Sequence, residues 1–182
     1  AGLAARLGNA SGLQEVTRQD IMSNFLLHRA CRGGHTAAVE FLLAKGADAR
    51  QLDPTGESPL HAACVAGTEA VIASLLAQGA ELGARSRSMG SAGLTALHIC
   101  ATFGHVGGVR TLLQAGADVD ADGGMAPDPN MKQRQKFWGA TPLMYAAVYG
   151  HLSTVEVLVE WGAKRGRRDG AGWTARRYAR KY

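Results

Sequence analysis

Residues 141–163, TPLMYAAVYGHLSTVEVLVEWGA, decide the fold because they predict two short helices joined by a turn. Thr141 suits an N-cap, and Pro142 suits the first helical position, where its missing N–H costs nothing. Gly150 ends the first helix, and Gly162 closes the second at a position suited to a left-handed backbone. Neither helix is long enough to be stable alone in water. The unit must therefore stack on copies of itself.

Copies of this stretch recur along the chain at constant internal offsets. The opening six residues recur at 25–30, 58–63, 95–100 and 174–179. The turn after the first helix recurs as Gly34-His35, Gly67-Thr68, Gly104-His105 and Gly150-His151. We therefore expect paired antiparallel helices at 58–66 and 68–78, 95–103 and 105–115, and 141–149 and 151–161.

The repeated pattern TPLHxAA…GH…LL…GAD resembles the ankyrin repeat, whose period is about 33 residues. The resemblance covers nearly the whole chain. It implies an all-α solenoid of helix–turn–helix units joined by β-hairpin-like loops. It also implies a module that recognises other proteins, although the scaffold alone does not identify the partner.

The repeats divide the chain into six segments. These are an atypical N-terminal capping unit at 1–20, repeat 1 at 21–53, repeat 2 with a short insertion at 54–90, repeat 3 with a long hairpin insertion at 91–137, repeat 4 at 138–170, and a basic C-terminal capping helix at 171–182. The long insertion, 122–136, is either a mobile solvated loop or a finger that contacts a partner.

The histidines and cysteines all fall on repeat positions, which favours structural roles for them. The resemblance implies that the first-helix histidines, such as His61 and His98, hydrogen-bond near the Ser or Thr cap and stiffen the stack. Cys31 and Cys64 are equivalent, and Cys100 lies one position earlier in its unit. No CxxC pair is present, so we expect free buried thiols, no metal site and no cofactor.

No catalytic motif appears in the sequence, so we expect a protein that is not an enzyme. A GxSxG elbow, a phosphate-binding loop and a dinucleotide fingerprint are all missing. No apolar run approaches the roughly 18 residues of a membrane span, and no signal peptide is visible. The cysteine pattern favours a reducing compartment. We therefore expect an intracellular protein, cytoplasmic or nuclear.

Positive charge is concentrated at the C-terminal end. Residues 164–182 carry eight basic residues and one acidic residue, whereas the whole chain has a net charge of +5. This end is either a solvated cap on the last repeat or a surface for an acidic protein segment, nucleic acid or an anionic membrane. The expected electrostatic contacts are Arg167, Arg168, Arg176 and Arg177.

Several large apolar residues occupy positions that the resemblance turns toward the groove of the array. They lie just before the cap or just before the turn glycine, and we expect a contiguous patch there. The expected partner-binding residues are Leu94, Thr102, Phe103, Trp138, Val148, Tyr149 and Trp173. The alternative is that the 122–136 insertion, or another domain, covers Phe103 and Trp138.

The sequence therefore favours a scaffold or adaptor that binds a partner protein or peptide in the groove. One alternative is a regulatory or targeting domain of a larger enzyme. A second is binding of nucleic acid or an anionic surface through the basic end.

Overall fold

The computed structural model describes residues 25–87, 92–124 and 138–181. Residues 25–32 are helical. The helices that follow are α2 (Thr36–Ala44), α3 (Pro59–Ala66), α4 (Glu69–Ala77), α5 (Ala96–Phe103), α6 (Val106–Gln114), α7 (Pro142–Val148), α8 (Leu152–Glu160) and α9 (Ala175–Lys181). The predicted helix pairs are confirmed. Their first helices begin one residue later than expected because Ser58, Thr95 and Thr141 are the N-caps.

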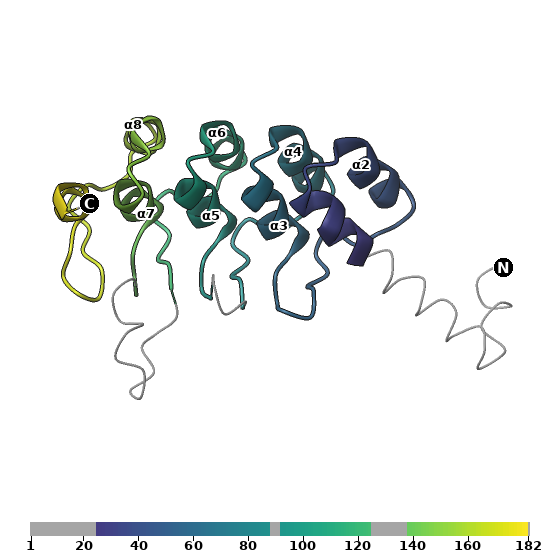
Figure 1. Cartoon of the computed structure of the whole chain (residues 1–182), viewed down its shortest axis with the longest axis horizontal. Helices are drawn as coiled ribbons and strands as arrows, with labels where there is room; N and C mark the ends of the chain where they lie inside the picture. Colours follow the sequence, from purple (N-terminus) through teal and green to yellow (C-terminus); the bar gives the residue numbers. More distant parts are fainter. Residues whose placement is uncertain (1–24, 88–91, 125–137, 182) are drawn as a thin grey trace, which may run out of the picture.

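The helices form two layers (Figure 1). Helices α3, α5, α7 and α9 pack on one another in chain order, and so do α2, α4, α6 and α8. Each turn joins the two layers, as in α3 with α4. The connecting loops project beyond the α3–α5–α7 layer as a row of fingers (Figure 1). Among the described helices, each unit packs on the units before and after it, as in a solenoid.

Within a finger, backbone hydrogen bonds join the outgoing arm of the loop to the returning arm, but the described residues form no strands. Ser86 N–H donates to the Leu94 carbonyl at 2.9 Å, and Gly93 N–H donates back to Ser86 at 2.7 Å. Gly123 and Ala140 form an isolated antiparallel bridge. The predicted capping unit at 1–20, most of the 122–136 insertion and residues 88–91 lie outside the described residues.

In repeats 1, 2 and 3 a histidine in the first helix links the unit to the next one. The Ser58 hydroxyl donates to His61 Nδ1 at 2.7 Å, and His61 Nε2 donates to the Leu94 carbonyl of the following finger at 3.2 Å. His98 repeats this with the Thr95 hydroxyl at 2.8 Å and the Ala140 carbonyl at 3.0 Å. The expected structural role of these histidines is confirmed.

Repeat 4 breaks the series, because Met144 stands where repeats 1, 2 and 3 have histidine. The Thr141 hydroxyl is buried and has no hydrogen-bond partner. The matching acceptor for a histidine, the Trp173 carbonyl, receives only the Asp169 N–H among the described backbone bonds. The junction between α7 and α9 therefore lacks the link that the preceding junctions have.

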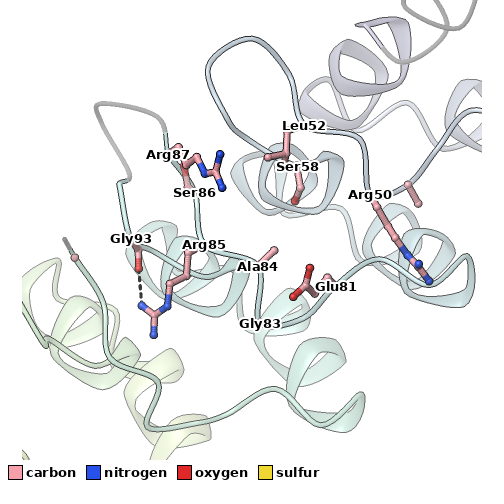
Figure 2. Close-up of a pocket in the computed structure, with 12 residues that line it drawn as sticks. Arg50, Leu52, Ser58, Glu81, Gly83, Ala84, Arg85, Ser86, Arg87 and Gly93 are labelled. Carbon is pink, nitrogen blue, oxygen red and sulfur yellow. Dashed lines mark hydrogen bonds between the residues drawn. The ribbon is translucent and has the colours of Figure 1, made fainter. Parts of the chain in front are cut away.

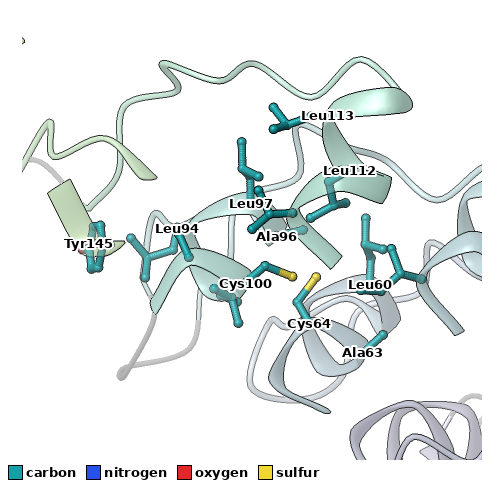
Figure 3. Packing of buried hydrophobic residues seen from close by; sticks show 14 of the residues in the cluster. Leu60, Ala63, Cys64, Leu94, Ala96, Leu97, Cys100, Leu112, Leu113 and Tyr145 are labelled. Atoms are coloured by element: carbon teal, nitrogen blue, oxygen red, sulfur yellow. The ribbon is translucent and has the colours of Figure 1, made fainter. Parts of the chain in front are cut away.

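The core runs along the whole array between the two layers. Its leucines and valines are fully buried, and small residues let the helices approach (Figure 3). All three cysteines are free and buried, as predicted. The thiols of Cys64 and Cys100 point toward each other across the α3–α5 contact, and burial raises the pKa of Cys64. Burial also raises the pKa of Cys31 to about 12, so Cys31 and Cys64 stay as unreactive thiols.

Candidate functional site: an exposed aromatic row and its surroundings

Two aromatic side chains extend from the C-terminal ends of successive first helices. Phe103 is the last residue of α5 and is 50% exposed, and Tyr149 follows α7 and is 54% exposed. The Phe103 ring stacks on His105, with centroids 5.8 Å apart, and the Tyr149 ring stacks on His151 at 6.4 Å. We call Phe103 and Tyr149 the aromatic row.

The histidines under the aromatic row are fixed to the preceding unit. His105 Nε2 donates to the Val65 carbonyl at 3.2 Å, and His151 Nε2 donates to the Thr102 carbonyl at 2.9 Å. Each exposed ring therefore rests on a side chain that is held at its far end. A ring that is ordered before binding loses little entropy when a partner covers it.

Trp138 is also exposed, at 44%, but it lies at the other end of α7. Its carbonyl accepts the Gly170 N–H at 2.6 Å, and a Cβ at Gly170 would lie 2.6 Å from its ring. The seven residues of α7 separate Trp138 from Tyr149, which corresponds to about 10 Å of helix. The backbone of Trp138 therefore lies apart from the end of α7 that carries Tyr149, because the whole helix lies between them.

The expectation that Leu94 is a solvated partner-binding residue is wrong, because its side chain is only 7% exposed. Its carbonyl accepts both the Ser86 N–H and the His61 Nε2–H, which hold the end of the finger against the helices. Its side chain lies in the core, in the direction of Tyr145 (Figure 3). The residue before the cap is buried in repeats 2 and 4 as well, as Glu57 and Ala140.

The remaining expected groove residues are half-buried. Thr102 donates its hydroxyl to the His98 carbonyl at 2.8 Å, and Val148 packs against the core. Trp173 packs against Tyr178, and the Arg177 guanidinium lies 4.1 Å from the centroid of the Trp173 ring. Among the seven expected partner-binding residues, Phe103, Tyr149 and Trp138 are the strongly exposed ones.

An open cavity of about 740 Å³ lies between the loop that leads to α3 and the loop that leads to α5 (Figure 2). Glu81 and Ser58 face its centre, and three arginines stand around its edge. Arg50 donates to the Gly79 carbonyl at 2.9 Å, and Arg85 donates to the Gly93 carbonyl at 3.0 Å. The sequence reasoning missed this cavity because it forms between two units. The only signal was the recurrence of arginine in the connecting loops at Arg50, Arg85 and Arg87.

The four expected electrostatic residues have different surroundings. Arg167 forms an ion pair with Asp122, and Arg168 donates to the Gly172 carbonyl at 3.0 Å. Arg177 covers Trp173, whereas Arg176 is exposed on α9. Lys164 lies 3.8 Å from Asp120. Part of the positive charge at this end is therefore neutralised within the molecule.

The described residues contain no cluster of three metal-binding side chains. Among them, no helix has both the length and the apolar character needed to cross a membrane. The exposed rings and arginines are carried by a continuous stack of helices.

Comparison with known protein families gave two matches. A model described as ankyrin repeats (3 copies) matches residues 3–86 and 27–122, and a model described as ankyrin repeat matches residues 138–170. A search of curated proteins found no match.

Proposed function

Because the chain belongs to the ankyrin repeat family, generally a protein-binding module, we propose that it is a scaffold or adaptor that binds a partner protein in the groove of the array. The aromatic row forms the centre of the contact, and Trp138 extends it toward the fingers. The observation that carries this proposal is the half-exposure of Phe103 and Tyr149 on successive units.

Physical chemistry supports this choice of residues. Aromatic side chains are enriched at protein interfaces and account for many binding hot spots. Each ring here stacks on a histidine that is anchored to the neighbouring unit, so burying it requires little ordering. Exposed apolar residues also occur on the α2–α4–α6–α8 layer and its ends, including Phe41, Leu152 and Trp161. The test must therefore compare the two layers.

The proposal extends to the setting of the protein. Cys31, Cys64 and Cys100 are buried and free, which supports a reducing compartment, and hence the cytoplasm or nucleus. Both matching family models describe ankyrin repeats, which are typically non-catalytic, and this supports a protein that is not itself an enzyme. The alternative is a regulatory or targeting module of a larger enzyme. The full-length reading frame would distinguish the two.

The experiment is affinity capture followed by measurement with the captured partner. We expect Phe103→Ala and Tyr149→Ala each to weaken binding more than about tenfold, since truncating a hot spot costs at least about 2 kcal/mol. The melting temperature should change little because both rings are exposed.

The matched control is Trp161→Ala, which removes a ring that is 40% exposed at the end of α8, and Glu156→Ala serves as a polar control. Both should bind as the wild type does. Equal weakening by Trp161→Ala would show that binding does not use the aromatic row. Unfolding caused by the Phe103 or Tyr149 variants would show that these rings contribute to the core.

A further inference from the structure

Four exposed arginines belong to the C-terminal unit, and we call them together the basic face: Arg165, Arg168, Arg176 and Arg180. None of them forms an ion pair with a carboxylate of the described residues. Arg176 and Arg180 are four residues apart on α9 and so lie on one side of the helix. Arg165 and Arg168 lie in the loop that leads to it.

The single acidic residue of this segment is turned away from the basic face. Asp169 is buried, and its Oδ1 accepts the N–H groups of Ala171 and Trp173 at 3.0 and 2.8 Å. Its Oδ2 accepts the hydroxyl of Tyr178, which lies on α9. The carboxylate therefore ties the arginine-bearing loop to the arginine-bearing helix. Its own charge is not displayed among the arginines.

The surroundings argue against two kinds of anionic partner. Single-stranded nucleic acid binds where bases can stack on open aromatic rings, but Trp173 is already covered by Arg177 and Lys181 at 4.1 and 4.7 Å. A helix that lies in a membrane surface inserts its apolar side. The apolar residues Ala175 and Tyr178 of α9 are instead buried against the array.

We propose that the basic face is a second docking surface, which binds an acidic segment of a partner protein. The planar guanidinium group matches a carboxylate with two parallel hydrogen bonds, and four of them stand on a framework held by Asp169. This surface adds to the proposed function without requiring the aromatic row, which lies at the ends of α5 and α7.

The test uses the full chain and a fluorescein-labelled peptide of ten glutamates, with binding followed by anisotropy at several salt concentrations. The variant replaces Arg165, Arg168, Arg176 and Arg180 with glutamine. We expect its affinity for the peptide to fall more than about tenfold and its salt dependence to flatten. If this variant does not fold, the loop pair Arg165→Gln and Arg168→Gln is compared instead, with an expected loss of about threefold or more.

The matched control removes the same number of positive charges elsewhere, by replacing Arg29, Lys45, Arg87 and Arg110 with glutamine. Peptide affinity should stay within about twofold of wild type, and an equal loss would reduce the effect to net charge and overturn the proposal. Tighter binding to decauridine or to phosphatidylserine vesicles than to the peptide would also overturn it. The Phe103→Ala, Tyr149→Ala double variant should retain peptide binding. The proposal for the aromatic row and the proposal for the basic face can therefore be refuted separately.

Discussion

Acidification should destabilise this protein through His98, which is fully buried between Thr95 and Ala140. Burial lowers the pKa of His98 from 6.5 to about 4, and the nearby positive charge of Arg85 acts in the same direction. The folded protein therefore holds a neutral imidazole at pH values where the unfolded chain binds a proton. The resulting stability is complete above about pH 6.5 and is lost as the pH falls toward 4.

The magnitude follows from the two pKa values. A difference of one unit between the folded and unfolded pKa values changes the free energy of unfolding by about 1.4 kcal/mol. The loss attributable to His98 is then about 2 kcal/mol between pH 7 and pH 5, and about 3 kcal/mol once the folded protein takes up the proton. Burial also lowers the pKa of His61, which adds to the same trend.

The assay is urea denaturation of wild type and His98→Met at pH 7 and pH 5. Methionine is the residue that repeat 4 already carries at this position. The variant should be less stable at pH 7 because it loses the bonds to Thr95 and Ala140. It should also lose about 2 kcal/mol less than wild type on acidification. Equal losses in both proteins would refute the reasoning, as would an NMR titration that places the His98 pKa near 6.5.

Two further predictions concern positions where the structure identifies a local cost. Thr154→Val should raise the free energy of unfolding, measured by denaturant titration, by about 1 kcal/mol, because the Thr154 hydroxyl is buried without a partner. The control Thr111→Val removes a hydroxyl that donates to the Gly107 carbonyl at 3.0 Å and should not stabilise the protein. Equal changes in the two variants would contradict the prediction. Gly104→Val should cost more than about 2 kcal/mol, because Gly104 has φ of 72° and a Cβ there would lie 2.6 Å from His151 Nδ1. Gly166→Ala, where a Cβ meets nothing within 4 Å, should be close to neutral in the same thermal melts, and similar effects of the two changes would contradict the argument.

The helix pairs could be predicted from sequence because each carries its own boundary signals. Thr95 and Thr141 occupy the N-cap positions of helices, and glycines such as Gly104 end helices at positive φ. These signals are local, so they do not depend on how the units stack. The histidine links could also be predicted, but only because the resemblance to the repeat family supplied them.

The candidate site was harder to predict because exposure depends on neighbouring units. Leu94 and Tyr149 both looked like solvated apolar residues in the sequence. The Leu94 side chain packs in the core, and its carbonyl accepts bonds from Ser86 and His61. The described part of the next unit leaves Tyr149 54% exposed. The cavity beside Glu81 likewise arises from two fingers that are far apart in the chain.

The missing histidine of repeat 4 affects how the array can come apart. At three successive junctions a first-helix histidine donates to the next finger, to the carbonyls of Glu57, Leu94 and Ala140. Opening any of these junctions breaks a buried hydrogen bond from imidazole to carbonyl, which costs free energy. Met144 has no such donor, so separation of α9 from α7 breaks no bond of this kind. Separation of the C-terminal unit therefore breaks one hydrogen bond of this kind fewer than a break at those junctions, and this is the unit that carries the basic face.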